Sequence, residues 1–345
     1  MKRRYQGGVA VVTALLLTTL AVTIVASLFW QQQVQVRSME NQRLQLQTRW
    51  IVRGALDLSR LVLYQDFLDS PNTTRLNGVW ATPLEETRLD DYIERERAQA
   101  ENFNATLSGR MLDAQSRYNL TNLVKAGQRA PDPQQVAAFQ RLLLNVQLDA
   151  GLAQAVATTV ANAQTLQTSA AAAAAAATDA SVTPPLLPTN SANPAIPLQS
   201  GQQSGAPQAL GLLRVEDLLT ISGFTPAAIE RLRELVIVLP ERTDLNVNTA
   251  PAELLAAAVD RLSLADAAAL VNVRRRTPFQ SPANFEEHAQ LSQNVALKAS
   301  IPIAVKSNYF LALSKVKLDR ATLDTVSLLK RANNGATSVE WIREN

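Results

Sequence analysis

Residues Val9–Trp30 read VAVVTALLLTTLAVTIVASLFW, and this uncharged stretch decides the fold. About 20 apolar residues are enough to cross the ~30 Å hydrocarbon core of a bilayer as one helix. The basic residues Lys2, Arg3 and Arg4 precede the stretch, and the positive-inside rule places them in the cytoplasm. We therefore predict a transmembrane helix over residues 9–30, with the rest of the chain on the other side of the membrane.

Two interpretations of this segment stay open. One is a plain signal anchor. The other uses Gly7-Gly8, because type IV pilin precursors are cut after a glycine at the cytoplasmic end of such a helix. Residues 1–8 would then be a prepilin leader, cleavage would fall between Gly8 and Val9, and Thr13 would be the fifth mature residue. Most pilins carry a glutamate there, which pairs with the N-terminal amine of a neighbouring subunit, and Thr13 cannot form that charge pair.

The residues that follow the membrane segment continue the same helix. No proline occurs from Gln31 to Tyr64, and Ile51, Ala55, Leu58 and Val62 recur at helical spacing. These four residues predict a helix face that packs on a folded domain. An unbroken helix through both stretches, ending near residue 63, would be about 80 Å long at 1.5 Å per residue.

The rest of the chain predicts both strands and short helices. Alternating side chains indicate a strand over 103–113 and an antiparallel meander over 307–318, 321–331 and 337–343. Short helices are predicted over 133–167, 214–221, 225–238, 263–276 and 284–291, with a further one beginning near Pro251. Residues 168–210 contain eight consecutive alanines and a proline-rich tract, which predict a disordered insert.

Composition argues against several classes of function. Lysine and arginine together number 33, against 30 acidic residues, so the formal charge is +3. A charge this close to neutral does not indicate nucleic-acid binding. There is no cysteine, and no nucleophile motif accompanies the single histidine, His288. We therefore predict that the chain is not an enzyme and has no catalytic residue and no metal site.

Three groups of polar residues have both a functional and a structural interpretation. His288 and its two neighbouring glutamates could hold a metal ion, but a solvated helix face is favoured. Arg274–Arg276 could contact phosphate, but a solvated helix end near its negative pole is favoured. Asn246 and Asn248 could bind a ligand, but local turn and capping hydrogen bonds in a buried loop are favoured.

A series of motifs carries a resemblance to a known family. They occur in the family's order along the chain, as Gln6–Ala10, Trp80–Pro83, Leu112–Leu123, Leu245–Leu255, Pro278–Ser281 with Phe285, and Ser307–Phe310. The chain resembles the general secretion pathway protein K family, the large minor pseudopilins of type II secretion systems. The first motif is shared by all pilin-like proteins, whereas Asn-Leu-Thr-Asn-Leu and Asn-Val-Asn-Thr-Ala-Pro are much more specific. The structural residues within these motifs are Trp80, Asp113, Asn119, Asn122, Asn246, Asn248, Pro251 and Phe279.

The resemblance implies an α+β fold. It consists of a type IV pilin-like scaffold, with a long N-terminal helix and an antiparallel sheet, and a large inserted all-α domain of SAM-like or helix-hairpin-helix type. The expected divisions are a prepilin leader over 1–8, the transmembrane half of the helix over 9–30, the periplasmic helix and first pilin-like part over 31–123, the inserted domain over 124–295 with its disordered insert over 168–210, and the C-terminal β-meander over 296–345.

The resemblance also implies a role in protein secretion. The chain would be a minor pseudopilin at the tip of the pseudopilus, helping to initiate its assembly and supporting export of folded proteins across the outer membrane. It would be a single-pass protein of the bacterial inner membrane, with its large C-terminal domain in the periplasm. Implied partners are the minor pseudopilins I, J and H, the major pseudopilin G, the inner-membrane assembly platform, and the prepilin peptidase, which would cleave after Gly8 and methylate Val9. The missing glutamate at Thr13 also fits this subunit.

One departure from the family pattern concerns calcium. Family members often carry an acidic run of the form Asp-Trp-x-Asp-x-Asp after the first inserted helices, with a Glu-Asp pair further on, and such oxygen-rich runs suit calcium. Here that place holds Ala161–Leu166, and Asp179 is the only acid between Ala150 and Arg214. We therefore expect no cofactor and predict that this calcium site is absent.

Two alternative functions stay open at this point. The first is a membrane-anchored helix-hairpin-helix protein that binds DNA, but Gly223 is isolated in its hairpin and the charge is nearly balanced. A nucleic-acid partner is therefore not expected. The second is a minor pilin of a surface type IV pilus, which loss of protein export or of twitching motility would separate from a pseudopilin.

Overall fold

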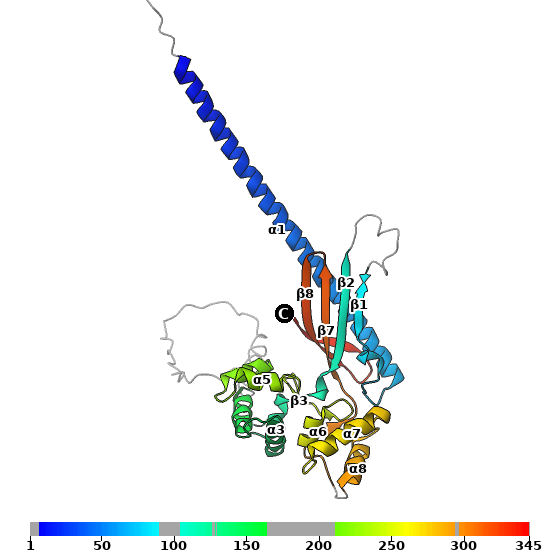
Figure 1. The fold of residues 1–345 in the computed structure, drawn as a ribbon. Coiled ribbons are helices and arrows are strands. Elements are labelled where there is room, and N and C mark those ends of the chain that lie inside the picture. The colour runs from blue at the N-terminus through cyan, green and yellow to red at the C-terminus, as the bar shows by residue number, and fades with distance from the viewer. Residues whose placement is uncertain are drawn as a thin grey trace, which may run out of the picture.

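A computed structural model describes residues 7–89, 104–125, 128, 130–163, 211–293 and 297–344. It consists of one long helix with a folded body around its far end (Figure 1). Helix α1 (Gly7–Asp69) has 63 residues and is unbroken, which corresponds to about 95 Å at 1.5 Å per residue. The predicted single helix is therefore confirmed. Most of the predicted leader and the whole predicted insert over 168–210 lie outside the described residues.

The second half of α1 packs on the sheet through a face that the helical spacing identified only in part. Val52, Leu56 and Leu63 are buried beside Ala55. Leu58, which was predicted on this face, is 44% exposed. The prediction was wrong at this position because apolar residues lie on both sides of the helix, so their spacing alone did not show which side the sheet covers.

A five-stranded antiparallel sheet lies against this half of α1 (Figure 1), with the order β1-β2-β7-β8-β9. Its strands are β1 (Leu84–Arg88), β2 (Ala105–Asp113), β7 (Tyr309–Leu318), β8 (Ala321–Arg331) and β9 (Thr337–Glu344). The predicted strand over 103–113 and the C-terminal meander are confirmed. Gly335 takes a φ of +85° in the turn between β8 and β9, which a side chain would disfavour.

The two faces of the sheet contribute to different apolar clusters. On β7, Phe310, Ala312 and Val316 pack with the buried residues of α1. Tyr309 and Leu311 alternate with them and pack on the opposite side, with residues of the helical body such as Ile237. This alternation follows the period of two of a strand, and it leaves the sheet between α1 and part of the helical body.

The helical body is inserted between two neighbouring strands. The chain leaves the sheet after Asp113 and returns at Tyr309, and Asp113 pairs directly with Phe310. One apolar cluster fills this body and contains residues from Tyr118 to Val305. The sequence-based division at 124 and 295 stays a prediction.

The elements of the helical body are short and follow one another closely. They are η3 (Ala114–Ser116), β3 (Tyr118–Asn119), η4 (Leu120–Leu123), α3 (Pro133–Asn145), a helix over 152–163, η5 (Val215–Thr220), α5 (Pro226–Leu232), β4 (Val236–Ile237), β5 (Leu245–Asn246), α6 (Ala252–Ala258), α7 (Leu264–Arg276), α8 (Pro282–Gln293) and β6 (Ile303–Ala304). Two small parallel ladders, β3 with β4 and β5 with β6, join distant parts of it.

Three predicted helices of this body need correction. The predicted helix over 133–167 is two helices within its described part, because Gln147 has a φ of +60° and the Asp149 carboxylate accepts the N–H of Gly151 before the second begins. Residues 164–167 lie outside the described residues. The predicted helix over 214–221 is a 3₁₀ helix, η5. The predicted helix over 225–238 ends at Leu232, because the chain then enters the ladder with β3.

Candidate assembly surface and buried polar junction

The first half of α1 is an uncharged surface. It contains an 18-residue stretch with a mean hydropathy of 2.3, and no part of this stretch is buried. Among the described residues, α1 is the one helix that is long and apolar enough to cross a membrane. Gly8 and Val9 lie in its first turn, and Thr13 is exposed on it. The Thr18 hydroxyl donates to the Leu15 carbonyl at 2.9 Å, which satisfies a polar group within an apolar surface.

The second half of α1 carries an outer stripe, which we define as Leu46, Trp50, Leu61 and Leu68. At 3.6 residues per turn these residues fall on the side of the helix opposite the face that packs on the sheet. Trp50 is 67% exposed and Leu61 is 63% exposed. The guanidinium of Arg53 lies 4.9 Å from the centre of the Trp50 ring. The stripe therefore continues along the folded body beyond the membrane half, with the exposed carboxylate of Asp57 on the same side between Trp50 and Leu61.

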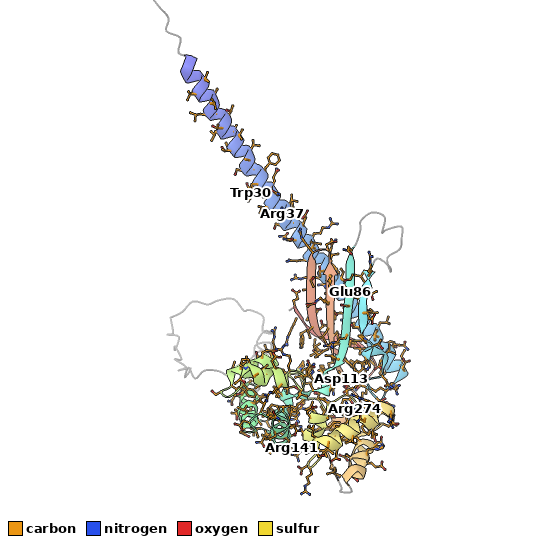
Figure 2. All side chains as sticks on the ribbon, viewed as in Figure 1. Trp30, Arg37, Glu86, Asp113, Arg141 and Arg274 are labelled. Carbon is orange, nitrogen blue, oxygen red and sulfur yellow. The ribbon has the colours of Figure 1, made fainter. Side chains whose placement is uncertain are left out.

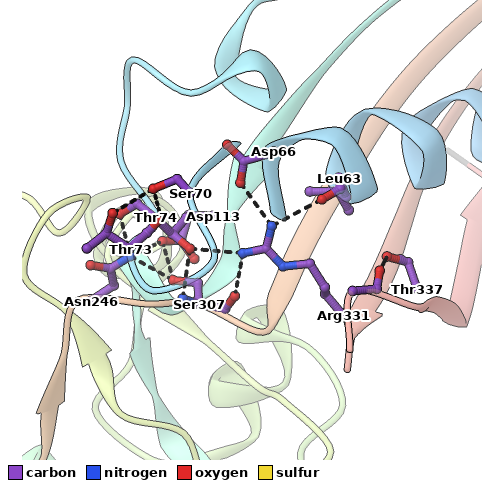
Figure 3. Close-up of polar contacts among 11 residues, drawn as sticks. Leu63, Asp66, Ser70, Thr73, Thr74, Asp113, Asn246, Ser307, Arg331 and Thr337 are labelled. Atoms are coloured by element: carbon purple, nitrogen blue, oxygen red, sulfur yellow. Dashed lines mark hydrogen bonds and ion pairs between the residues drawn. The ribbon is translucent and has the colours of Figure 1, made fainter. Parts of the chain in front are cut away.

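A buried polar junction lies where α1, the sheet and the helical body meet (Figure 3). Its centre is Asp113, which is 3% exposed. One carboxylate oxygen accepts the hydroxyls of Ser307 and Thr249, both at 2.6 Å, and the Asn246 amide at 3.0 Å. The other accepts the N–H of Gln115 at 2.8 Å. Burial raises the pKa of Asp113, and these four hydrogen bonds oppose the rise.

The same junction contains a buried ion pair. Arg331 Nη1 donates to the Asp66 carboxylate at 2.9 Å, and the two side chains are 1% and 3% exposed. Arg331 Nη2 donates to the Thr74 hydroxyl at 3.0 Å and to the Ser307 carbonyl at 3.1 Å (Figure 3). Burial raises the pKa of Asp66, while the hydrogen bond from Arg331 lowers it. Arg331 on β8 thus connects the end of α1 with the segment that leads into β7.

The asparagines of the two specific motifs bind remote backbone. Asn122 donates to the Thr243 carbonyl at 2.7 Å and accepts the Thr243 N–H at 3.1 Å. Asn248 does the same with Phe279, at 2.9 Å in both directions. Asn119 donates to the Glu241 carbonyl at 2.8 Å. Each side-chain amide thus provides hydrogen bonds to backbone groups of a loop that pairs with no strand.

Asn246 has a local and a long-range role. It accepts the N–H of Asn248 in an Asx turn at 2.9 Å, as predicted. Its amide also donates to Asp113, to the Ser307 hydroxyl and to the Thr74 carbonyl. The long-range hydrogen bonds were not predicted, because spacing along the chain does not reveal which distant loop approaches a side chain.

The remaining predicted residues lie in separate places. Trp80 is buried on the sheet and meets the Phe310 ring edge-on at 5.4 Å. Pro251 is the N-cap residue of α6. Phe279 packs between Phe285 and His288, with ring centres 5.3 and 5.5 Å away. His288 is therefore half-buried beside an aromatic ring rather than on a fully solvated face.

Arg274 also departs from expectation. It is 6% exposed, and its guanidinium donates to the Val247 carbonyl at 2.7 Å, whereas Arg275 and Arg276 are exposed. Burial lowers the pKa of Arg274 to about 10. The predicted solvated helix end thus holds for two of the three arginines, and Arg274 stabilises the loop of the second specific motif.

Sequence reasoning missed Thr74, Thr249 and Arg331 as members of the junction. Thr249 was within a quoted motif, so its position next to two asparagines was an available signal. Arg331 is the last residue of a predicted strand, and its local sequence fits an exposed arginine equally well. Nothing in its local sequence shows that α1 and the helical body enclose it.

Comparisons with known proteins agree with the family resemblance that the motifs carry. Two family models, both described as type II secretion system (T2SS), protein K, match residues 116–241 and 245–306, which together are more than half of the chain. The chain belongs to the type II secretion system protein K family. Members of this family are minor pseudopilins, which are structural proteins of the secretion system.

Individual relatives cover nearly the full length. The chain is 29% identical over 343 residues to type II secretion system protein K of Pseudomonas aeruginosa, covering 98% of this chain and 92% of the relative. It is 28% identical to the protein K of Aeromonas hydrophila, covering 96% and 98%. The predicted family and the function as a minor pseudopilin of the type II secretion system are therefore confirmed.

A solved structure has the same fold. A chain in the crystal structure of the GspK-GspI-GspJ complex from the type 2 secretion system of enterotoxigenic Escherichia coli aligns with a TM-score of 0.60. The two chains are 17% identical, and the alignment covers 90% of this chain and 99% of that one. This likeness confirms the predicted pilin-like α+β architecture. With its apolar first helix, the protein is membrane-anchored with a globular C-terminal part.

Proposed function

We propose that this minor pseudopilin stands at the tip of a pseudopilus and joins it through the outer stripe of α1. The observation that carries the proposal is an apolar stripe on the outside of a helix that runs on into the membrane segment. Exposed large apolar side chains in a row on a folded protein indicate a protein interface. The helical body lies at the end of the sheet far from the membrane segment (Figures 1 and 2), which suits a terminal subunit.

Thr13 supports the same placement. After cleavage at Gly8 it would be the fifth residue, where most pilins carry a glutamate that pairs with the terminal amine of a neighbouring subunit. A subunit without this carboxylate forms no such charge pair, so it needs no neighbour on that side. We propose that this chain therefore begins the assembly, with the soluble body in the periplasm and the chain anchored in the inner membrane.

The proposed partners are minor pseudopilins of the I and J types, by analogy with the complex named for the E. coli structure. Minor pseudopilin H, major pseudopilin G and the assembly platform are proposed on the family resemblance alone. We propose a structural role without enzymatic activity, since the polar side chains brought together at the junction are occupied by one another.

The outer stripe can be tested by charge insertion. Trp50→Asp combined with Leu61→Asp is expected to weaken the complex with the I and J subunits by about 30-fold or more, because buried aromatic anchors in an interface contribute about 2 kcal/mol or more. Affinity is measured with full-length chains purified in detergent from co-expressing cells.

The matched control places the same charges on other exposed leucines. Leu144→Asp combined with Leu264→Asp changes two residues that are 61% and 45% exposed on α3 and α7. This control should leave the affinity within about twofold. Equal losses in both double variants, or none in the first, would contradict the assignment of the stripe as the interface.

Processing gives a second expected result. N-terminal mass spectrometry of the chain from cells that contain the prepilin peptidase should find Val9 as a methylated first residue. Gly8→Asp should leave residues 1–8 attached, because the cut in type IV pilin precursors follows a glycine. An intact leader on the wild-type mature protein would contradict the pilin-type interpretation and favour a plain signal anchor.

Calcium gives a third expected result. We propose that the chain lacks the family's acidic calcium site, since Asp179 is the only acid between Ala150 and Arg214. The unfolding temperature should be the same in excess calcium and in excess chelator, because a ligand that binds only the folded state must raise it. Micromolar calcium binding in calorimetry would overturn this.

A further inference from the structure

A cleft lies on the face of the sheet opposite α1, between the sheet and the helical body. It has a volume of about 450 Å³, and its walls include residues of β2, β7, β8 and β9 on one side and the segments 213–216 and 233–238 on the other. A second hollow of about 310 Å³ adjoins it and shares Arg110, Leu313 and Val326 with it. We refer to these two adjoining hollows together as the groove.

The floor of this groove is apolar and only partly covered. Leu313, Val326 and Trp341 are half-buried members of the apolar cluster on this face of the sheet. Leu213 stands at the rim and is 66% exposed. A groove of this size with an apolar, partly aromatic floor can accept several side chains of another polypeptide.

The charges around this floor are unbalanced. Five arginines line the cleft together with two glutamates. Arg117 pairs with Glu234 at 2.9 Å, and Arg233 pairs with Glu216 at 3.4 Å. The other three are Arg110, Arg214 and Arg343, and none of them forms an ion pair with an acid in the part of the chain that the structure describes.

Arg343 shows how these cations are held. Its guanidinium lies 3.9 Å from the centre of the Trp341 ring and donates to the Leu213 carbonyl at 2.9 Å. Burial and the nearby charge of Arg214 lower the pKa of Arg343, and the acids Asp217 and Glu216 act in the opposite sense. The Asp217 carboxylate itself is occupied by the N–H groups of Leu213 and Arg214.

We propose that this groove binds an acidic segment of another polypeptide, with its carboxylates at Arg110, Arg214 and Arg343 and its apolar side chains on Leu313, Val326 and Trp341. Arginine binds carboxylates with two parallel hydrogen bonds, and a planar guanidinium stacked on a tryptophan is ordered before the partner arrives. The apolar floor favours a peptide over a small inorganic anion, because an anion would leave the floor uncovered. This groove lies on the other face of the sheet from the outer stripe, so the proposal does not rest on that stripe.

The test measures binding of a defined acidic peptide to the full-length chain in detergent. The probe is a short fluorescein-labelled peptide of alternating glutamate and leucine, followed by fluorescence anisotropy. A lysine–leucine peptide of the same length and inorganic phosphate are the comparison ligands. The wild-type chain should bind the acidic peptide, should not bind the basic one, and should not release the acidic peptide to phosphate at comparable concentrations.

Two double variants then locate the site. Arg110→Glu combined with Arg214→Glu reverses two exposed cations of the groove and should lower the affinity by about tenfold or more. Arg275→Glu combined with Arg276→Glu makes the same change of charge at the exposed end of α7 and should alter it by less than about twofold. Circular dichroism and thermal unfolding verify that both are folded.

Two substitutions of Leu213 test the rim of the groove. Leu213→Asp places an acid on the exposed rim and should weaken binding of the acidic peptide, while Leu213→Met should leave its affinity unchanged. Equal losses in the two arginine double variants would show general charge attraction and overturn the proposal. Binding of phosphate that competes fully with the peptide would show a simple anion site and would also overturn it.

Discussion

Replacing Asp113 by alanine is expected to lower the free energy of unfolding by about 4 kcal/mol. The substitution leaves four buried donors without their acceptor, and each buried donor left unpaired costs about 1–3 kcal/mol. Three of these donors are the side chains of Asn246, Thr249 and Ser307, and the fourth is the backbone N–H of Gln115. The total is lower than a sum of four separate costs because the hydroxyls can rotate toward other acceptors.

The substitution Asp113→Ala should also change the number of unfolding transitions. Asp113 ends β2, Thr249 and Asn246 belong to the helical body, and Ser307 leads into β7, so the carboxylate joins two parts of the protein. Without it, the helical body should unfold before the sheet, giving two transitions where the wild type shows one. Full-length chains in detergent are followed by circular dichroism during urea unfolding, which reports both the midpoint and the number of transitions.

A control and the dependence on pH sharpen this result. Asp57→Ala removes an acid from the exposed pair with Arg60 and should cost less than about 1 kcal/mol. Burial raises the pKa of Asp113 above 3.8, so the folded chain binds a proton that the unfolded chain has released. The stabilisation from this group therefore falls as pH rises from 3.8 through the folded pKa, and the cost of Asp113→Ala should be smaller at pH 7 than below pH 3.8. A cost that grows with pH would contradict the raised pKa.

Replacing Arg331 by leucine is expected to lower the free energy of unfolding by about 3–5 kcal/mol. This change leaves the Asp66 carboxylate buried without its cation and removes donors from Thr74 and Ser307. It also removes a guanidinium that lies 4.8 Å from the centre of the Phe310 ring. The end of α1 should detach from the sheet first, which hydrogen exchange of the α1 amides would report as lost protection near residue 66.

Two further variants test the ion pair itself. Arg49→Leu breaks an exposed pair with Glu344, whose side chains are 59% and 47% exposed, and should cost less than about 1 kcal/mol. Arg331→Leu combined with Asp66→Leu removes both buried charges and should recover part of the loss, since no unpaired charge remains. If the single variant Arg331→Leu were as stable as Arg49→Leu, the junction would not be a major source of stability.

Local patterns were enough to predict most of the elements. The spacing of apolar residues predicted α1, and alternation predicted β7, on which Phe310 and Tyr309 contribute to opposite faces of the sheet. Such patterns depend only on the few residues on either side of each position, so they hold in the folded state as well. They failed at Leu58 and after Leu232, where a partner element decided the outcome.

The junction could be predicted only in part for the same reason. The motifs marked Asp113, Asn246 and Asn248 as structural, and all three are buried with several hydrogen bonds. Thr74, whose carbonyl accepts from Asn246, and Arg331, which donates to Thr74 and Ser307, lie far away in sequence and belong to unremarkable stretches. The junction exists because three separate parts of the chain meet there, and no local pattern carries that information.

The place of insertion has an evolutionary consequence. Asp113 and Phe310 are opposite each other on adjacent strands, so the chain departs from and rejoins the sheet across a single interstrand gap of about 5 Å. A simple hairpin turn would bridge the same gap. Lineages could therefore lengthen, trim or replace everything between these positions while the ancestral pilin framework kept its strand register.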